Sequence, residues 1–318
     1  MKIGIIGAGT VAAATAKSLV RTGGADPEIV IVNRNRQKAN GLAEDMGYAA
    51  ALESLASVRA GDYDDLEGAA LVILTAGVNE KDGGATDRSD PKGRLKLIPL
   101  NAKVYAAVVP PVIDAAPDAT LLVVTDPPDP LADLTRGLAP SQHVVSAGTV
   151  IDSLRFRHQI AREFGLHARD VSADVVGEHG TSSVYLWSSA TVGGAGVLVL
   201  FERRGDDVEE AKRRIHSAAE FGNISIIEGI GASQHGIGAV VGRLAEAIVN
   251  DERTVYPVAS YQQEYQVTLG LPSVLGATGV LRTVVPELTA EEQAGLEASA
   301  AVLRQASSVA MDAARPAA

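Results

Sequence analysis

A histidine in a glycine turn and an Asp-x-x-Arg pair are the residues whose types and spacing could carry chemistry. His179 lies in the turn 177–180, which reads Gly-Glu-His-Gly, and histidine is the side chain best suited to transfer a proton near pH 7. Asp152 and Arg155 stand three residues apart in a stretch of helical periodicity, so they would share one helix face. A guanidinium there can hold a carboxylate. Alternatively, Asp152 and Arg155 form an ion pair and His179 is structural.

A second cluster is a glycine turn near the start of the chain. An apolar run at 2–6 leads into Gly-Ala-Gly-Thr-Val-Ala at 7–12 and then a helical stretch. Gly7 would permit a tight turn, Gly9 would let backbone approach a pyrophosphate, and the helix N-terminus would supply N–H groups. This arrangement predicts dinucleotide binding, with a purely structural turn as the alternative. The residues expected at the cofactor are Gly7, Gly9, Thr10, Val11, Asn33, Arg34, Thr75, Ala76 and Gly77.

The end of the second apolar run bears on which cofactor binds. NAD sites carry an acidic residue there to accept from the ribose 2′-hydroxyl, whereas this chain has Asn33 followed by Arg34. An arginine can pair with a 2′-phosphate. The sequence therefore predicts NADP or NAD, with NADP favoured. In the alternative, Arg34 is a solvated charge and Asn33 bonds the hydroxyl of NAD.

An α/β framework must position these residues. Apolar runs at 2–6, 29–32, 71–75, 121–124 and 143–146 alternate with helical stretches at 12–22, 37–46, 95–115 and 130–138. That alternation predicts a doubly wound parallel sheet of the Rossmann type over 1–149. An α+β substrate domain is expected over 150–318, with strands at 173–176 and 197–202, helices at 153–164, 207–221 and 237–250, and a last helix capped by Thr289 and Glu292.

Composition excludes several classes of protein. The 318 residues suit about two domains. The 28 basic against 39 acidic residues give a net charge of −11, so no nucleic-acid or membrane partner is expected. The lack of cysteine excludes disulfides, thiol nucleophiles and Cys-ligated metals. No metal is predicted, and the absence of a recognisable leader fits a cytoplasmic location.

The chain resembles the lactate/malate dehydrogenase family over nearly its whole length. The resemblance rests on the amino-terminal glycine turn, the Asp-x-x-Arg helix, the Gly-Glu-His-Gly turn, and the segments 231–233 and 271–274. It implies an NAD(P)-dependent (S)-2-hydroxyacid dehydrogenase that transfers a hydride between nicotinamide and a 2-keto or 2-hydroxy acid. It also implies a homodimer or homotetramer.

The resemblance assigns roles to four residues. His179 would donate the proton, and Asp152 would accept from the other ring nitrogen and raise the histidine pKa. Arg155 would grip the substrate carboxylate, and Arg94 would polarise the carbonyl once a polar loop at 80–93 closes. Asn101 and Ser233 are also expected at the substrate.

The substrate prediction depends on Arg88. It lies six residues before Arg94, where malate enzymes resemble one another in having arginine and lactate enzymes in having glutamine. This favours malate/oxaloacetate, although the loop is about eight residues longer than the family pattern. The alternatives are a specialised 2-keto acid reductase, a lactate dehydrogenase and a non-catalytic nucleotide-binding protein. Related NAD-dependent glycoside hydrolases use a cysteine that this chain lacks.

Asp126 departs from the family pattern. The family has an Asn-Pro-x-Asp turn, whose asparagine lies near the substrate oxygen, and here the turn begins with Asp126. A carboxylate beside a carboxylate substrate is unfavourable unless it is neutralised. Asp126 could pair with an arginine, select a substrate with an amine or extra hydroxyl, or impair the enzyme.

Overall fold

An eight-stranded sheet forms the centre of the protein. The structure is a computed structural model of the whole chain, and it describes residues 1–22, 27–79, 81–83, 86–87, 90 and 93–315. The strand order is β14-β13-β6-β5-β4-β1-β2-β3. Six strands are parallel: β1 (Lys2–Ile6), β2 (Glu28–Val32), β3 (Ser57–Gly61), β4 (Leu71–Leu74), β5 (Thr120–Val123) and β6 (Val144–Ser146). Two antiparallel strands, β13 (Ala259–Gln262) and β14 (Val267–Gly270), extend one edge.

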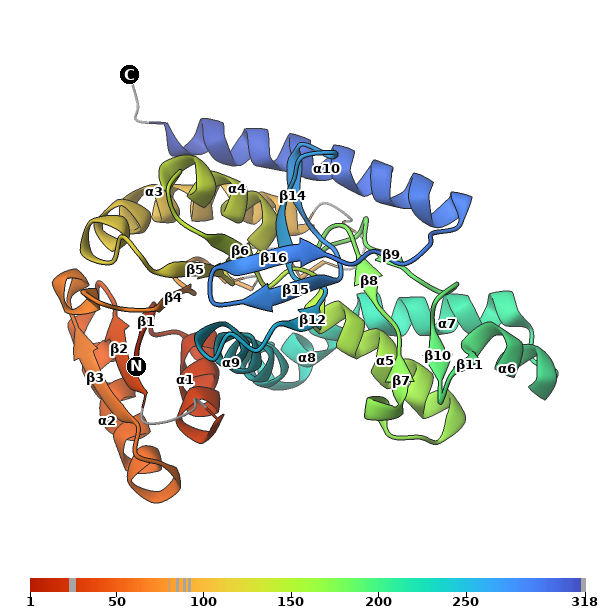
Figure 1. Cartoon of the computed structure of the whole chain (residues 1–318), viewed down its shortest axis with the longest axis horizontal. Coiled ribbons are helices and arrows are strands. Elements are labelled where there is room, and N and C mark those ends of the chain that lie inside the picture. Colours follow the sequence, from red (N-terminus) through yellow and green to blue (C-terminus); the bar gives the residue numbers. More distant parts are fainter. Residues whose placement is uncertain (23–26, 80, 84–85, 88–89, 91–92, 316–318) are drawn as a thin grey trace.

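Helices cover both faces of this sheet (Figure 1). One face carries α1 (Thr10–Thr22), α2 (Arg36–Glu53) and α9 (His235–Val249), and the other α3 (Ile98–Ala115), α4 (Pro128–Leu138) and α10 (Ala290–Ala314). Successive residues of β2 alternate between the two cores: Ile29 and Ile31 face the first, and Val30 and Val32 the second. Burial on both faces explains the uninterrupted apolar strands. The predicted doubly wound parallel sheet is confirmed.

The strand order determines where a ligand can bind. The chain leaves β1 and β4 in opposite directions along the sheet, so a crevice opens outside their carboxyl ends. Gly7 follows β1, Thr75 follows β4 and Asp126 lies just beyond β5. The predicted cofactor and substrate residues therefore meet at one edge of the sheet.

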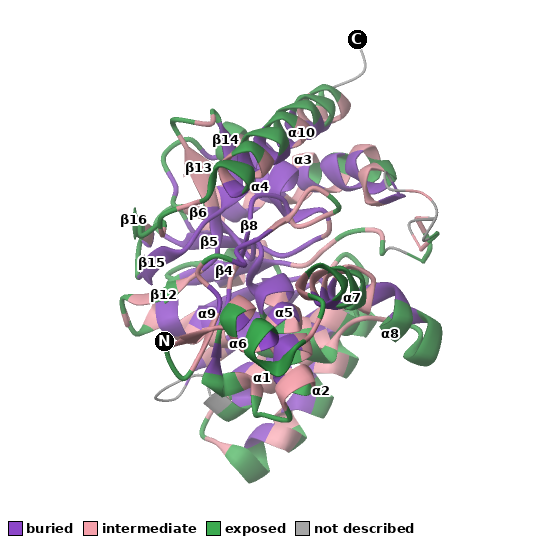
Figure 2. Cartoon of the chain, turned by 90° about the vertical axis from the view of Figure 1, so that its right-hand side faces the viewer, coloured by how far each residue is buried: buried purple, intermediate pink, exposed green. Residues whose placement is uncertain are grey.

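The second half of the chain adds a smaller helical body, on the right in Figure 1. Its helices are α5 (Val150–Phe164), α6 (Val197–Arg204), α7 (Val208–Glu220) and α8 (Gly222–Ile230). Short strands accompany them: β7 (Val171–Ser172), β8 (Val175–Val176), β9 (Val184–Tyr185), β10 (Thr191–Val192) and β11 (Ala195–Gly196). Phe156, Trp187 and Phe201 belong to its core. A separate three-stranded sheet, β12 (Thr254–Tyr256), β15 (Ser273–Gly276) and β16 (Gly279–Thr283), packs against α9 and β6 of the sheet domain. In Figure 2 the central strands are buried while α6 and α8 present much exposed surface.

The prediction of a strand at 197–202 is wrong, because these residues form the helix α6. A strand would bury Val197, Val199 and Phe201 together. Instead Val197 and Phe201 are fully buried one helical turn apart, and Val199 is 43% exposed. Gly205, in the left-handed conformation, ends the helix. The sequence reasoning also missed β3, whose Ser-Val-Arg-Ala-Gly sequence has one β-branched residue.

One helix of the described residues, Gly93–Ala115, is long and apolar enough to cross a membrane by composition alone. In this fold it packs against α4 and α10 and buries Tyr105 and Val109. These contacts are those of a core helix of the sheet domain. Its first turn, η2 (Gly93–Leu97), carries Arg94.

Candidate active site

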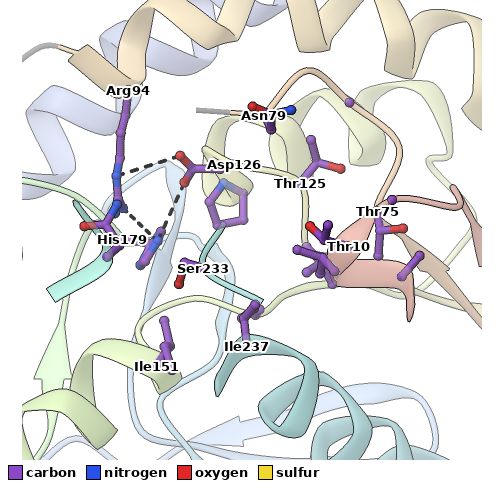
Figure 3. Close-up of a pocket in the computed structure, with 18 of the residues that line it drawn as sticks. Thr10, Thr75, Asn79, Arg94, Thr125, Asp126, Ile151, His179, Ser233 and Ile237 are labelled. Atoms are coloured by element: carbon purple, nitrogen blue, oxygen red, sulfur yellow. Dashed lines mark hydrogen bonds and ion pairs between the residues drawn. The ribbon is translucent and has the colours of Figure 1, made fainter. Parts of the chain in front are cut away.

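A cavity of about 300 Å³ opens at the carboxyl edge of the sheet (Figure 3). Its wall joins the first glycine turn and the ends of β4, β5 and β6 to α5 and the 177–180 turn. Of the predicted site residues, it is lined by Gly9, Thr10, Val11, Thr75, Gly77, Arg94, Asp126, Arg155, His179 and Ser233. Residues far apart in the sequence thus form one site.

His179 is held from two sides. Gly177, at φ +84°, turns the chain after β8, and the backbone N–H of His179 donates to Asp129 Oδ2 at 3.0 Å. The side chain of His179 lies with Nδ1 2.5 Å from Asp152 Oδ2. Asp152 stands in the first turn of α5. The imidazole therefore has Nδ1 fixed by a carboxylate and directs Nε2 toward the cavity.

The electrostatics of this pair favour opposite charges. Burial alone would raise the pKa of the Asp152 carboxyl, but His179, Arg155 and Arg94 outweigh it and lower that pKa to about 2. Burial and Arg94 lower the pKa of His179, yet Asp152 and Asp126 raise it above its ordinary value. Asp152 is thus a stable anion, and it opposes the effect of burial on the pKa of His179.

Two arginines complete the cationic side of the site. Arg94 reaches the histidine, with its Nη1 2.8 Å from His179 Nε2. Arg155 lies one helical turn after Asp152, and its Nη1 donates to Asp152 Oδ1 at 3.3 Å. The side chain of Arg155 is 14% exposed and lines the cavity. Both guanidiniums can thus meet an anionic ligand beside His179.

Asp126 faces the same point. Its Oδ1 lies 3.6 Å from His179 Nε2 and its Oδ2 3.8 Å from Arg94 Nε. Figure 3 shows the carboxylate directed at both partners. Of the three sequence-based explanations, the structure brings an arginine close, which supports pairing.

Three predicted substrate residues have different outcomes. Ser233 lines the cavity. The fully buried Asn101 instead uses its amide to accept from Val78 N at 2.7 Å and to donate to the carbonyl oxygen of Asp126 at 2.7 Å. Asn101 thus links the segment after β4 to the segment after β5. It is not among the described lining residues of the cavity. Arg88 lies outside the described residues.

The glycine turn fits a dinucleotide. Gly7 has φ +124°, and a Cβ there would lie 2.6 Å from Thr75 Oγ1. A Cβ on Gly9 would meet nothing within 4 Å, so this backbone is open to a ligand at the N-terminus of α1. The space and the N–H groups suit a pyrophosphate. Ala76 supports this turn indirectly, since its carbonyl accepts from Thr125 Oγ1 at 2.9 Å.

Asn33 and Arg34 lie at the end of β2, away from the described lining of the cavity. Asn33 Nδ2 donates to the carbonyl oxygen of Asn35 at 3.0 Å, and Arg34 is exposed. The nearby Arg36 is bound to Asp62 at 2.8 Å. Arg34 thus extends from the end of β2 as an exposed side chain, whereas Arg36 is held by Asp62.

Sequence reasoning missed several lining residues. Ile151 and Ile237 form an apolar wall opposite Thr125 in Figure 3. The periodicity of their helices could have indicated inward-facing residues. Asn223, buried on α8, also lines the cavity. The sequence signal for Asn223 is weak, because its helix carries other polar residues, Ser225 and Glu228.

Fold and site together define the class: an α/β dehydrogenase that binds a nicotinamide dinucleotide beside a proton-transferring histidine. The family model for the NAD binding domain of lactate/malate dehydrogenase matches residues 1–145, and that for the α/β C-terminal domain matches 149–312. The chain belongs to the lactate/malate dehydrogenase family. It is an NAD-dependent dehydrogenase acting on the CH–OH group of a 2-hydroxy acid.

Individual relatives match over almost their full length. The chain is 41% identical over 305 residues to the L-lactate dehydrogenase of Deinococcus radiodurans, covering 96% of this chain and 97% of that protein. It is 41% identical over 315 residues to the L-lactate dehydrogenase of Thermus aquaticus, with 97% and 99% covered. A solved lactate dehydrogenase from a Medee basin deep-sea metagenome library is 30% identical, with a TM-score of 0.88 and 97% and 98% of the two chains covered.

Proposed function

We propose that this enzyme interconverts (S)-lactate and pyruvate. The observation that carries the proposal is the charge of the cavity. Among its described lining residues, the arginine, lysine, aspartate and glutamate side chains are Arg94, Arg155 and Asp126, whose formal charges sum to +1. A substrate with one carboxylate balances that charge, whereas a dicarboxylate would leave a surplus anion near Asp126. The names of the relatives, L-lactate dehydrogenase, also support lactate.

The malate prediction rests on Arg88, which lies outside the described residues. Arg88 would raise the net formal charge from +1 to +2 if it reached the cavity. The choice between lactate and malate therefore depends on whether the Arg88 side chain contacts the substrate.

In the proposed mechanism, His179 takes the hydroxyl proton of the 2-hydroxy acid at Nε2 and returns it to the keto oxygen in the reverse direction. Asp152 keeps Nδ1 protonated, so Nε2 is the nitrogen that exchanges the proton. Arg155 holds the substrate carboxylate and Arg94 stabilises negative charge on the reacting oxygen. A nicotinamide cofactor, when held by the glycine turn, would supply or accept the hydride. Ile151 and Ile237 keep water from the reacting atoms.

We further propose that the cofactor with a 2′-phosphate is preferred. An acid at the end of β2 would repel that phosphate, and this chain carries Asn33 there with the exposed Arg34 beside it. A charge-assisted hydrogen bond of about 1.5–3 kcal/mol would give NADP roughly a tenfold to hundredfold advantage. The glycine turn serves either cofactor, so NAD remains a substrate.

The test of the substrate is a comparison of kcat/KM for pyruvate and oxaloacetate with NADPH and NADH. We expect pyruvate to be the better substrate, and His179→Asn to reduce its turnover by about 10²–10⁴-fold. Arg88→Gln should leave pyruvate reduction nearly unchanged. A preference for oxaloacetate that Arg88→Gln abolishes would establish malate instead. Tight NADPH binding without turnover of either acid would overturn both.

We propose a homo-oligomer as the working form. Leu52 and Leu55, at the end of α2, are 87% and 81% exposed in the single chain, and apolar surface of this kind is often covered by a partner. Light scattering at several concentrations would distinguish a dimer or tetramer from a monomer.

A further inference from the structure

The carboxylate of Asp126 is aimed at the point where the substrate oxygen must lie. That oxygen has to approach His179 Nε2, and Asp126 Oδ1 lies 3.6 Å from the same nitrogen. The side chain of Asp126 is only 20% exposed, and both of its carboxylate oxygens are buried. Neither oxygen receives a hydrogen bond within the described part of the chain. Since buried acceptors without donors are costly, a donor supplied by the ligand would satisfy this one.

The position of Asp126 is fixed by its surroundings. Asn101 donates to the Asp126 backbone carbonyl at 2.7 Å, and Asn101 is itself fully buried. The carboxylate remains between Arg94 and His179, with Oδ2 3.8 Å from Arg94 Nε. This separation is an ion pair without a hydrogen bond. Asp126 is therefore held beside the reacting position while its lone pairs remain available.

A carboxylate at this position distinguishes the two forms of the substrate. Carboxylate oxygens only accept hydrogen bonds, whereas a hydroxyl can both donate and accept. While the His179 ring is protonated and donates from Nε2, the 2-hydroxyl of a hydroxy acid can accept from His179 and Arg94 and donate its single proton to Asp126. A keto oxygen has no proton to donate, so it would meet the carboxylate as one acceptor meets another. An asparagine at this position could instead donate to the keto oxygen.

We propose that Asp126 is a specificity-determining residue that makes the site favour the 2-hydroxy acid over the corresponding 2-keto acid. The inference rests on the proposed lactate–pyruvate function and concerns the same site. Because the overall equilibrium constant fixes the ratio of kcat/KM in the two directions, the preference must appear in the affinities of the bound forms. The ligand class is a 2-hydroxy monocarboxylic acid with its hydroxyl at Asp126.

The test compares two ligands bound to the same enzyme–cofactor complex. Lactate and oxamate, an unreactive analogue of pyruvate with an amide in place of the methyl ketone, are titrated into the enzyme saturated with NADH or NADPH. Dissociation constants are read from the change in cofactor fluorescence, without turnover. The variants are Asp126→Asn and, as a matched control, Glu220→Gln. Glu220 lines the adjoining cavity, so the control removes one negative charge nearby without altering the group that faces His179.

We expect the wild type to bind lactate more tightly than oxamate. In Asp126→Asn the ratio of oxamate to lactate affinity should rise about tenfold to a hundredfold, and Glu220→Gln should leave the ratio unchanged. A ratio that stays within about threefold in Asp126→Asn, or an equal rise in the control, overturns the inference. If Asp126→Asn fails to fold, the wild type decides: tighter lactate supports the inference and tighter oxamate overturns it.

Failure of the proposed function would look different. If neither lactate nor oxamate changes the fluorescence of the bound cofactor, the proposed substrate is wrong and the inference about Asp126 is overturned with it. If both bind but Asp126→Asn leaves their ratio unchanged, the inference alone is overturned.

Discussion

His179 and Asp152, 27 residues apart in the sequence, meet at 2.5 Å between Nδ1 and Oδ2. The contact joins a loop after β8 to the first turn of α5. Burial opposes charge on both residues, yet the pair keeps Asp152 ionised, with its pKa lowered to about 2, and raises the pKa of His179. The acid–base character of the site therefore depends on a carboxylate that need not touch the substrate.

Asp152→Asn should change both rate and pH dependence. Removal of the main favourable anion lowers the pKa of His179, and reduction requires the imidazolium. In the wild type, kcat/KM for pyruvate should fall as pH rises through the raised pKa of His179, and in the variant the fall should begin at lower pH. We expect a loss of about 10²–10⁴-fold at neutral pH, measured by stopped-flow or steady-state absorbance. Asp174→Asn, which removes the partner of Arg157, is the control and should keep the wild-type profile.

Arg155→Lys should separate binding from chemistry. Lysine keeps the positive charge but lacks the planar fork that holds a carboxylate through two hydrogen bonds. We expect KM for pyruvate to rise about tenfold to a hundredfold, with a smaller effect on kcat. Arg157→Lys is a matched control on the same helix, because Arg157 pairs with Asp174 at 2.5 Å. A normal KM in Arg155→Lys would remove Arg155 from the substrate site.

Arg34→Ala tests the cofactor preference. The change should weaken NADPH binding by about tenfold or more and leave NADH within about twofold. Calorimetric or fluorescence titration gives both dissociation constants. Asn33→Asp should act in the same direction by placing a negative charge near the phosphate. Arg21→Ala, an exposed arginine near Glu53, should change neither. Equal losses for both cofactors in Arg34→Ala would argue against a phosphate contact.

Asp129 should make stability depend on pH. Its carboxyl is fully buried, and burial raises its pKa to about 7 despite hydrogen bonds from the His179 backbone and Ser146. The folded state then binds more protons than the unfolded state between about pH 4 and pH 7. The free energy of unfolding contributed by Asp129 is thus largest at low pH and decreases as pH rises through 7. Thermal unfolding from pH 4.5 to 8.5 should show a smaller decrease in Asp129→Asn.

Much of this site could be predicted from the sequence, because several of its contacts are between residues close together in the chain. The Asp-x-x-Arg spacing placed Asp152 and Arg155 on one helix face, and the glycine turn predicted the cradle at Gly7. The contact between Arg94 and His179 joins residues 85 positions apart, and only the packed fold brings them to 2.8 Å. Likewise, the spacing could not reveal that Asn101 uses its amide on two backbone segments. Val197–Arg204 shows the same limit, because a continuous apolar run rich in valine suited a strand, whereas tertiary packing selects a helix.

The pH profile of Asp126→Asn offers a second view of the carboxylate at the reacting nitrogen. Burial lowers the pKa of His179, whereas Asp152 and, to a smaller extent, Asp126 raise it. Replacing Asp126 by asparagine should therefore move the pH dependence of His179 toward lower pH. Lactate oxidation, which requires neutral His179, should reach its plateau at lower pH, and pyruvate reduction should begin to decline at lower pH. The displacement should be smaller than in Asp152→Asn, because Asp152 lies 2.5 Å from the ring and Asp126 3.6 Å. Full profiles in both directions test this order. A displacement larger than that of Asp152→Asn would mean that Asp126, and not Asp152, dominates the charge on His179.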